Sequence, residues 1–282
     1  MIQAGRGQQR LSPLVRKELA MEYKTVLYSV KDGVADVVMN QPQALNPMND
    51  DSMDDMLAVL AECERDESVK AVVLSGAGKA FCGGGDIRYF RAELEKPGFG
   101  LGPLVTKVGQ AVLAIRRLSK PVVCAVHGAA AGGGCNLVFA CDIAVAADNA
   151  KFIEAFVNIG LAPDTGGVFT LPRLIGQARA FELMSTGRPM KADEAYSLGL
   201  VNEVCPAEEL LDRAHAIAER YAAGPGKVYA RLKQMMNASL YSGLEDYLKL
   251  EAQYMDELSK TEDFKEGINA FLEKRKAEFK GI

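Results

Sequence analysis

Apolar residues in the first half of the chain alternate between strand and helix spacing. Two β-rich runs, at 24–30 and 34–39, flank Lys31-Asp32-Gly33, and this pattern predicts a β-hairpin. Asn49 then precedes apolar residues at helical spacing, which predicts an amphipathic helix to about residue 64. Further strands are expected at 71–74, 121–126 and 143–146, and further helices from about residue 86, at 104–118 and at 134–140. Nearly continuous apolar strands between helices are typical of an α/β core whose sheet is covered on both faces.

After about residue 176 the pattern becomes almost entirely helical. Helices are expected at 178–185, 192–198, 207–223, 228–239 and 244–258. We therefore divide the chain into an α/β core at 21–200 and a helical C-terminal region at 201–282. Residues 1–20 are cationic, as in a transit peptide, but they contain no long apolar segment, so a disordered extension is expected.

The composition narrows the classes of function. The 282 residues carry 33 basic and 37 acidic side chains, and this net charge of −4 argues against nucleic acid as the main partner. Six scattered cysteines and only two histidines predict neither a metal site nor a disulfide framework, and they indicate a reduced, cytoplasmic protein. The uncharged segment 121–141 contains Pro121 and the Gly132-Gly133-Gly134 triplet. We therefore interpret it as a buried strand, turn and helix, and not as a membrane span.

Two glycine-rich turns, at 80–87 and 126–136, are the first candidates for chemistry. Each follows an apolar strand and opens a helix, where unpaired N–H groups suit a ligand oxygen that carries negative charge. Either turn alone is explained as well by a loop or by close packing. Two of them in one domain indicate the paired N–H donors that an oxyanion hole requires. A third segment, 159–167, contains Asp164, which in isolation is typical of a turn or a helix cap.

Five segments, in order, resemble the crotonase family, the enoyl-CoA hydratase/isomerase superfamily. Residues 40–46 are similar to its N-R-P-x-x-L-N segment, and residues 80–87 to its A-F-C-x-G-x-D-[IL] segment. Residues 132–143 match its G-G-G and C-D-[IL] pair. The motifs T-G, A-x-E-A and G-L-V follow at 186–187, 192–195 and 199–201. This resemblance implies a spiral of ββα units with a helical C-terminal trimerisation region.

The resemblance also implies a substrate and a set of site residues. The substrate is an acyl-CoA thioester, so coenzyme A arrives as part of the substrate and no separate cofactor is expected. The N–H groups of Gly85 and Gly133 form the oxyanion hole. The residues along the CoA moiety are Ala44, Leu45, Gly84, Asp86 and Ile87. Phe271 and Lys274 reach the CoA of a neighbouring subunit in a homotrimer or homohexamer.

Departures from the family pattern bear on the reaction. Family hydratases hold water between two glutamates, but Asn136 and Phe156 occupy these two positions here. Glu154 lies two residues from the second position, and we expect it to face solvent. Water addition by two carboxylates is therefore disfavoured.

Asp164 is the remaining candidate base. The Pro-Asp-x-Gly-Gly form of its segment resembles the isomerases of phenylacetyl-CoA catabolism, where an aspartate at this place serves as the base. The family's aryl-CoA dehalogenases also use this aspartate, but they need a Trp, which this chain lacks, and a His where Leu113 stands. The resemblance favours an enoyl-CoA isomerase. A hydratase and a non-catalytic acyl-CoA-binding protein remain as alternatives.

Overall fold

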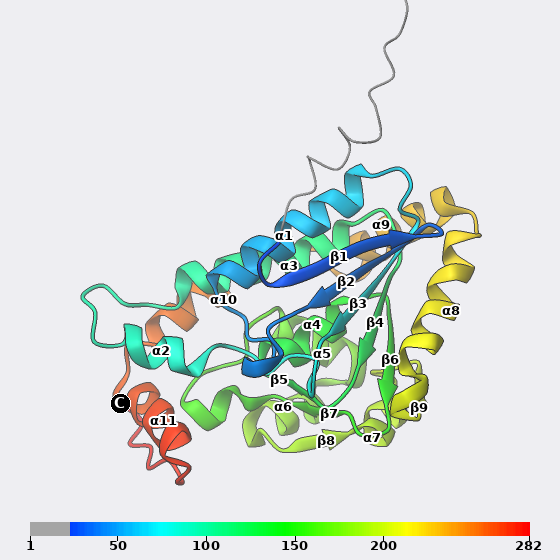
Figure 1. The fold of residues 1–282 in the computed structure, drawn as a ribbon. Coiled ribbons are helices and arrows are strands. Elements are labelled where there is room, and N and C mark those ends of the chain that lie inside the picture. The colour runs from blue at the N-terminus through cyan, green and yellow to red at the C-terminus, as the bar shows by residue number, and fades with distance from the viewer. Residues whose placement is uncertain (1–22) are drawn as a thin grey trace, which may run out of the picture.

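The computed structural model describes residues 23–282, drawn as a ribbon in Figure 1. The expectations for residues 1–20 lie outside this part of the chain. The described residues form one large sheet, one small sheet and helices packed around both.

The large sheet has six strands in the order β1-β2-β3-β4-β6-β9. Only β1 and β2 pair antiparallel, through the hairpin that the sequence predicts, and every later neighbour in the sheet is parallel. Asp32 and Gly33 both have positive φ, as a tight hairpin turn requires. The strands are β1 (Val26–Lys31), β2 (Val34–Met39), β3 (Ala71–Gly76), β4 (Val122–Val126), β6 (Ile143–Ala147) and β9 (Glu203–Cys205).

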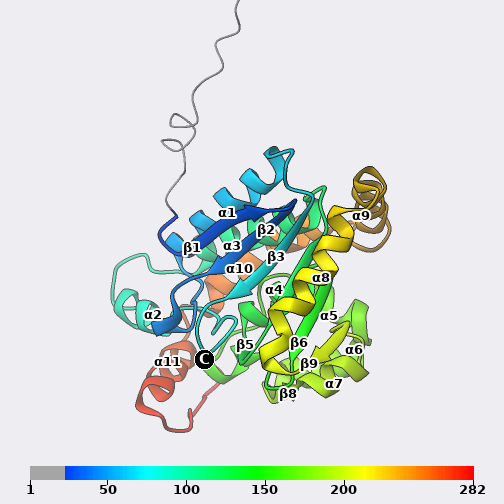
Figure 2. The same ribbon diagram turned by 45° about the vertical axis from the view of Figure 1, so that its right-hand side comes forward.

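Helices cover both faces of the central strands β3, β4 and β6, which explains why these strands are almost entirely apolar. On β3, Val72 and Leu74 point into the main core together with α1 (Asp50–Arg65) and α3 (Gly102–Arg117). Ala71 and Val73 point the other way, toward α8 (Leu210–Ala222), which lies in front of the sheet in Figure 2. Both β9 and α8 follow residue 200, so the helical C-terminal region also completes the sheet.

The small sheet was not predicted from the sequence. It joins β5 (Ala129–Ala131), β7 (Lys151–Ile153) and β8 (Pro189–Lys191). Three residues are too few to show a spacing pattern, so only the tertiary pairing reveals these strands. The uncharged segment 121–141 forms β4 and α4 (Gly133–Ala140), as expected, with the unpredicted strand β5 between them. No helix within residues 23–282 is both long and apolar enough to cross a membrane.

The remaining elements connect and cover these sheets. They are η1 (Pro42–Ala44), α2 (Ile87–Glu93), η2 (Ala155–Ile159), α5 (Gly167–Ile175), α6 (Gln177–Thr186), α7 (Ala192–Ser197), η3 (Ala207–Glu209), α9 (Gly226–Leu240), α10 (Leu244–Leu258) and α11 (Glu262–Glu273). Two of them bear on the site: α10 packs along α3, and α11 packs against α2 and η2. All six cysteines are free thiols, and five of them are buried, as their apolar surroundings predict.

Candidate active site

The two glycine-rich turns lie side by side. Cys82 and Ala130 form a parallel bridge, in which Cys82 N donates to Ala129 O at 3.1 Å and Ala131 N donates to Cys82 O at 2.9 Å. Gly84 has φ +88°, and a Cβ at this position would lie 2.7 Å from Ala131 O. Glycine is therefore required where the two turns meet, and this contact brings residues 83–85 next to the start of α4.

The N–H groups of Gly85 and Gly133 are the two donors that the family resemblance assigns to an oxyanion hole. Both residues line the same cavity, and Gly133 is the first residue of α4. Neither nitrogen donates a hydrogen bond to another group within residues 23–282. Unpaired N–H groups at a helix start and an adjoining turn are the donors expected for a carbonyl oxygen that gains negative charge.

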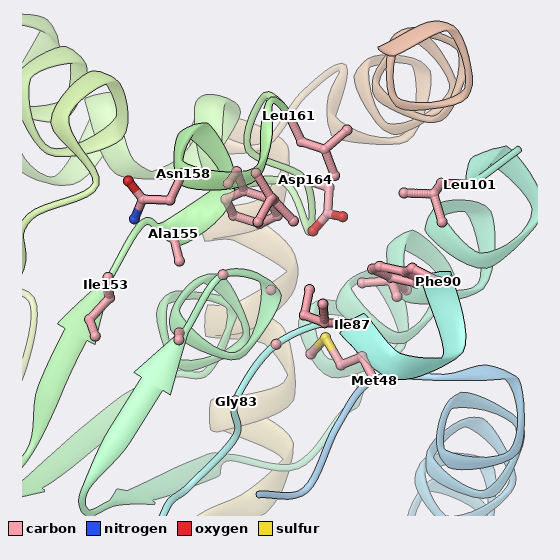
Figure 3. A pocket seen from close by; sticks show the side chains of 18 of the residues that line it. Met48, Gly83, Ile87, Phe90, Leu101, Ile153, Ala155, Asn158, Leu161 and Asp164 are labelled. Carbon is pink, nitrogen blue, oxygen red and sulfur yellow. The ribbon is translucent and has the colours of Figure 1, made fainter. Parts of the chain in front are cut away.

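The cavity between these turns and the helices has a volume of about 370 Å³ and an apolar lining (Figure 3). Helix α3 contributes Leu104, Val105 and Val108, and α10 contributes Met255. Among the described residues that line this cavity, Asp164 has the only ionisable side chain. The cavity therefore suits an apolar group held next to a single carboxyl.

Asp164 lies in the turn between η2 and α5, with its carboxyl directed into the cavity (Figure 3). A Cβ on Gly133 would lie 3.3 Å from Asp164 Oδ1, so the carboxyl is adjacent to the start of α4. Burial raises the pKa of Asp164 to about 6, although the Thr165 hydroxyl donates to Oδ1 at 2.6 Å and acts in the opposite direction. At neutral pH the group is a carboxylate with a pKa suited to accepting a proton.

Asn136 holds the turn that carries Asp164. Its Nδ2 donates to Asp164 O at 2.9 Å, and Gly167 N donates to the same oxygen at 3.0 Å. The Asn136 side chain is buried behind the cavity and does not line it. At the position of the first hydratase glutamate, this chain therefore has a residue that supports the backbone of Asp164.

The expectation that Glu154 faces solvent is wrong. Its side chain is only 3% exposed, and Oε2 accepts a hydrogen bond from Asn136 Nδ2 at 3.3 Å. Burial raises its pKa to about 8, and the negative charge of Asp164 acts in the same direction. The chain leaves the extended conformation at Glu154 to enter η2, so Glu154 and Phe156 are not on one side. Phe156 lines the cavity and Glu154 does not.

The residues assigned to the CoA moiety fall into two groups. Four of them line the cavity: Leu45, Gly84, Ile87 and Phe271. The other three do not: Ala44 ends η1, Asp86 accepts a hydrogen bond from Tyr89 N at 3.0 Å as the N-cap of α2, and Lys274 ends α11 with φ +56°. Phe271 lies at the cavity of its own chain because α11 packs on α2 and η2. Contact of Phe271 and Lys274 with a neighbouring subunit's CoA stays a prediction.

Glu251 on α10 was not found from the sequence. Both its carboxylate oxygens accept a hydrogen bond from Gly166 N, at 3.0 and 3.2 Å, two residues from Asp164. Burial is the main cause that raises its pKa to about 8, and the charge of Asp164 is the second. The sequence does contain a signal for it, because Glu251 follows Leu244 and Leu248 at helical spacing and so lies on the buried face of α10. An acid on an apolar stripe marks a group with a specific partner.

The described residues contain no group of three His, Cys, Asp or Glu side chains placed to hold a metal ion. Asp164, Glu154 and Glu251 belong to one electrostatic neighbourhood, yet Asn136 separates the first two and the Gly166 backbone lies between the first and the third. One carboxyl therefore lines the cavity, and two further buried acids lie near it without lining it.

The chain is similar to known proteins over most of its length. The family model described as "Enoyl-CoA hydratase/isomerase" matches residues 29–282. A trans-2-decenoyl-[acyl-carrier-protein] isomerase of Streptococcus mutans is 36% identical over 93% of this chain and 100% of that protein. A 1,2-epoxyphenylacetyl-CoA isomerase of Escherichia coli is 38% identical over 91% of this chain and 98% of that protein. A short-chain-enoyl-CoA hydratase of Clostridium acetobutylicum is also 38% identical, over 92% and 98%.

Among solved structures, an enoyl-CoA hydratase from Mycobacterium avium subsp. paratuberculosis matches with a TM-score of 0.84 and 30% identity. It covers 92% of this chain and 100% of its own. The α/β architecture predicted from the five motifs is therefore confirmed. The relatives carry both isomerase and hydratase names at similar identity. The comparisons therefore show the family of this chain and do not distinguish which of the two reactions it catalyses. The chain belongs to the enoyl-CoA hydratase/isomerase family.

Proposed function

We propose that this protein is an enoyl-CoA isomerase that moves a carbon–carbon double bond next to a CoA thioester. The Asp164 carboxylate removes a proton from one carbon of the acyl chain, and the electrons move toward the thioester oxygen. The N–H groups of Gly85 and Gly133 stabilise the resulting enolate. Protonated Asp164 then returns the proton to another carbon of the conjugated system. Product and substrate have the same atoms, and the double bond has shifted.

The observation that carries this proposal is the single carboxyl in a largely apolar cavity, next to two N–H groups without partners among the described residues. An isomerase needs only one group that takes and returns a proton, and Asp164 has a pKa of about 6 because it is buried. The apolar wall supports a hydrocarbon acyl group.

Hydration is the second candidate, because several relatives are named hydratases. Addition of water needs one group to activate the water and another to protonate the substrate. Asn136 cannot remove a proton, and Phe156 has no polar group. Glu154 lies outside the cavity lining, and its pKa of about 8 leaves it protonated at neutral pH. The residues therefore support isomerisation over hydration.

The test offers the purified protein 3-enoyl-CoA and 2-enoyl-CoA esters of increasing chain length, separates the products by liquid chromatography, and analyses them by mass spectrometry and by the ultraviolet absorbance of the conjugated 2-enoyl thioester. Isomerisation leaves the mass unchanged and shifts the double bond, whereas hydration adds one water. We expect conversion of the 3-enoyl ester without a mass change. Substantial hydration of crotonyl-CoA would contradict the reading of Asn136 and Phe156. Tight binding of every ester with no turnover would favour the acyl-CoA-binding alternative.

We also propose assembly as a homotrimer or homohexamer. Helix α9 supports this, because it buries only Lys233 and leaves large apolar side chains exposed. These are Val228, Leu232, Met235, Met236 and Leu240. An exposed apolar face of this kind is typical of a protein–protein contact. Light scattering on the eluted protein measures the assembly, and a monomer at micromolar concentration would contradict it.

A further inference from the structure

The Glu251 side chain accepts hydrogen bonds from the backbone of the turn that carries Asp164. It comes from α10, 85 residues further along the chain, and its side chain is 4% exposed. Gly166 N donates to both of its carboxylate oxygens, at 3.0 and 3.2 Å. One turn later on the same helix face, Met255 lines the cavity itself. Helix α10 therefore forms part of the cavity wall and also contacts the loop that carries the carboxyl.

The turn that Glu251 contacts has an unfavourable backbone conformation. Thr165 has φ +58° and Gly166 has φ +71°, so two consecutive residues lie in the left-handed region. A β-branched residue such as threonine rarely adopts this conformation, and it persists only where surrounding contacts hold it. Inside the buried turn, the Gly166 N–H needs an acceptor, because an unpaired buried donor costs about 1–3 kcal/mol.

We propose that Glu251 is a positioning residue: by accepting the N–H of Gly166 it holds the left-handed Thr165–Gly166 turn and so keeps the Asp164 carboxyl beside Gly133. This inference rests on the proposed function for its effect on turnover. Three side chains then support the turn, since Asn136 donates to the carbonyl of Asp164, Thr165 donates to its carboxyl, and Glu251 accepts from the N–H of Gly166.

The Glu251 carboxyl accepts this hydrogen bond without adding a second negative charge beside Asp164 at neutral pH. The groups that face Asp164 are Thr165 in its own turn, Glu154 at the start of η2, and Glu251 and Tyr247 on α10. Glu154 and Glu251 have pKa values of about 8, above that of Asp164, so Asp164 ionises first. A glutamine at 251 keeps a neutral oxygen acceptor and resembles the protonated state.

The experiment compares Glu251→Leu, Glu251→Asp and Glu251→Gln with the unaltered protein, and uses Glu257→Leu on the exposed face of α10 as the matched control. We expect Glu251→Leu to lower kcat by about 10- to 100-fold with little change in KM, because small misplacements of a catalytic group have effects of this size. Glu251→Asp, whose carboxylate is drawn back by one methylene, falls between. Glu251→Gln retains the acceptor and restores turnover, and Glu257→Leu has no effect.

Two results would overturn the proposal. Glu251→Leu with unchanged kcat and a lower melting temperature would show that Glu251 only stabilises the fold. A loss in Glu251→Gln as large as in Glu251→Leu would show that the hydrogen-bond acceptor is not what matters. If Glu251→Leu does not fold, the comparison of Glu251→Asp with Glu251→Gln decides, since both keep a polar side chain.

A second readout needs no turnover. Infrared difference spectra, assigned by subtracting Asp164→Asn, follow the titration of the Asp164 carboxyl. In Glu251→Leu the turn relaxes toward solvent, and we expect the pKa of Asp164 to move from about 6 toward its ordinary value of 3.8. An unchanged titration contradicts positioning. If the shift appears in a protein that isomerises no ester, the proposed function fails while the positioning role stands.

Discussion

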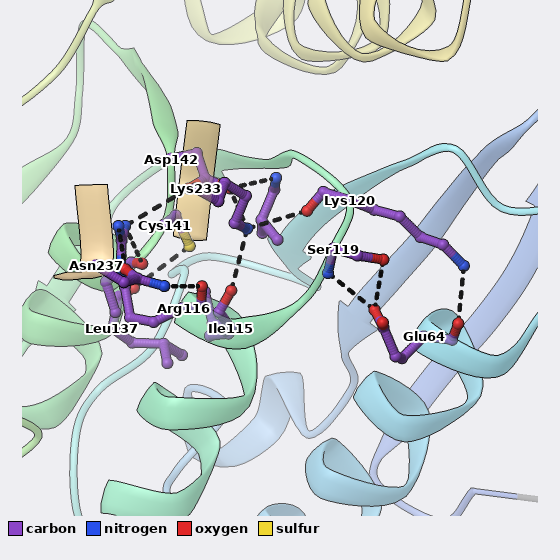
Figure 4. A network of polar contacts seen from close by, with 12 residues as sticks. Glu64, Ile115, Arg116, Ser119, Lys120, Leu137, Cys141, Asp142, Lys233 and Asn237 are labelled. Atoms are coloured by element: carbon purple, nitrogen blue, oxygen red, sulfur yellow. Dashed lines mark hydrogen bonds and ion pairs between the residues drawn. The ribbon is translucent and has the colours of Figure 1, made fainter. Parts of the chain in front are cut away.

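The two ends of α4 carry two different buried polar clusters. At its C-terminal end, Arg116 Nη1 donates to Ala140 O at 3.3 Å, and Asp142 pairs with Arg116 at 3.5 Å and with Lys233 at 2.5 Å (Figure 4). At its N-terminal end, Asp164 lies beside Gly133, with Glu154 and Glu251 behind it, and none of these three acids forms an ion pair within residues 23–282.

The two clusters differ in whether their buried carboxyl groups are paired with cations. At the C-terminal end, two cations meet one carboxylate, a helix carbonyl and Asn237, which suits the negative end of a helix. Buried charges that are paired and hydrogen-bonded act as structure. At the N-terminal end, burial without a cation raises the pKa of every acid. Such a carboxyl is costly for the fold and is useful as a base.

Removing the base is the largest expected change in activity. Asp164→Asn keeps the shape of the side chain but cannot accept a proton, so kcat should fall by about 10²- to 10⁴-fold. Calorimetric titration with a non-reactive CoA ester should give an almost unchanged Kd, because the apolar wall and the two N–H groups remain. Asn158→Ala, on the same cavity, is the control. Wild-type turnover by Asp164→Asn would show that the acid cluster is not reactive.

Removing the carboxylate that pairs with Arg116 and Lys233 should instead lower the stability of the fold. Asp142→Ala leaves Arg116 and Lys233 buried without their carboxylate, and we expect a loss of about 3–5 kcal/mol in the free energy of unfolding. Urea unfolding followed by circular dichroism measures it. Asp246→Ala, which removes the exposed pair with Lys249, should change little. A similar small effect at Asp142 would mean that the two clusters do not differ in this way.

Replacing an unpaired buried acid with a neutral residue should instead increase the free energy of unfolding. The folded-state pKa of Glu154 is about 8, above the ordinary 4.5, so the folded state binds more protons between these values. Its contribution to stability therefore falls as pH rises from about 4.5 to about 8 and is lowest above that. Glu154→Gln should be more stable than wild type by about 2–4 kcal/mol near about pH 9, and similar below about pH 5.

Urea unfolding at both pH values measures this gain, with the exposed Glu257→Gln as control. A destabilised Glu154→Gln at about pH 9 would show that the carboxylate form is favourable in the folded protein.

The smallest effect concerns the pH dependence of turnover. Asp164 must be ionised to remove a proton, and its pKa is about 6, so kcat/KM should be half-maximal near about pH 6 and fall about tenfold for each pH unit below that. Rate measurements in buffers of constant ionic strength give this profile. If the rate instead fell only near the ordinary aspartate pKa of 3.8, Asp164 would be in contact with solvent. Its carboxyl would then lack the desolvation that raises the pKa of the buried acids around it.

Local sequence predicted much of the architecture and part of the site. The hairpin, the apolar strands and the helix spacing were correct because each depends on residues close together in the chain. Glycine at 84 and an aspartate after Pro163 indicated special backbone positions. The three-residue strands were missed, and Glu154 was placed in solvent because strand alternation was assumed past the point where the chain turns into η2.

The sequence by itself determined most of the elements, the small excess of acidic over basic side chains and the presence of an aspartate after Pro163, since these follow from spacing and from residue type. Only the tertiary structure decided how these residues act together. It placed Gly85 and Gly133 on one cavity through the Cys82–Ala130 bridge, and it brought Glu251 to Gly166 across 85 residues. The pKa of Asp164 was also decided there, because desolvation depends on which side chains surround a group and not on its neighbours in the chain.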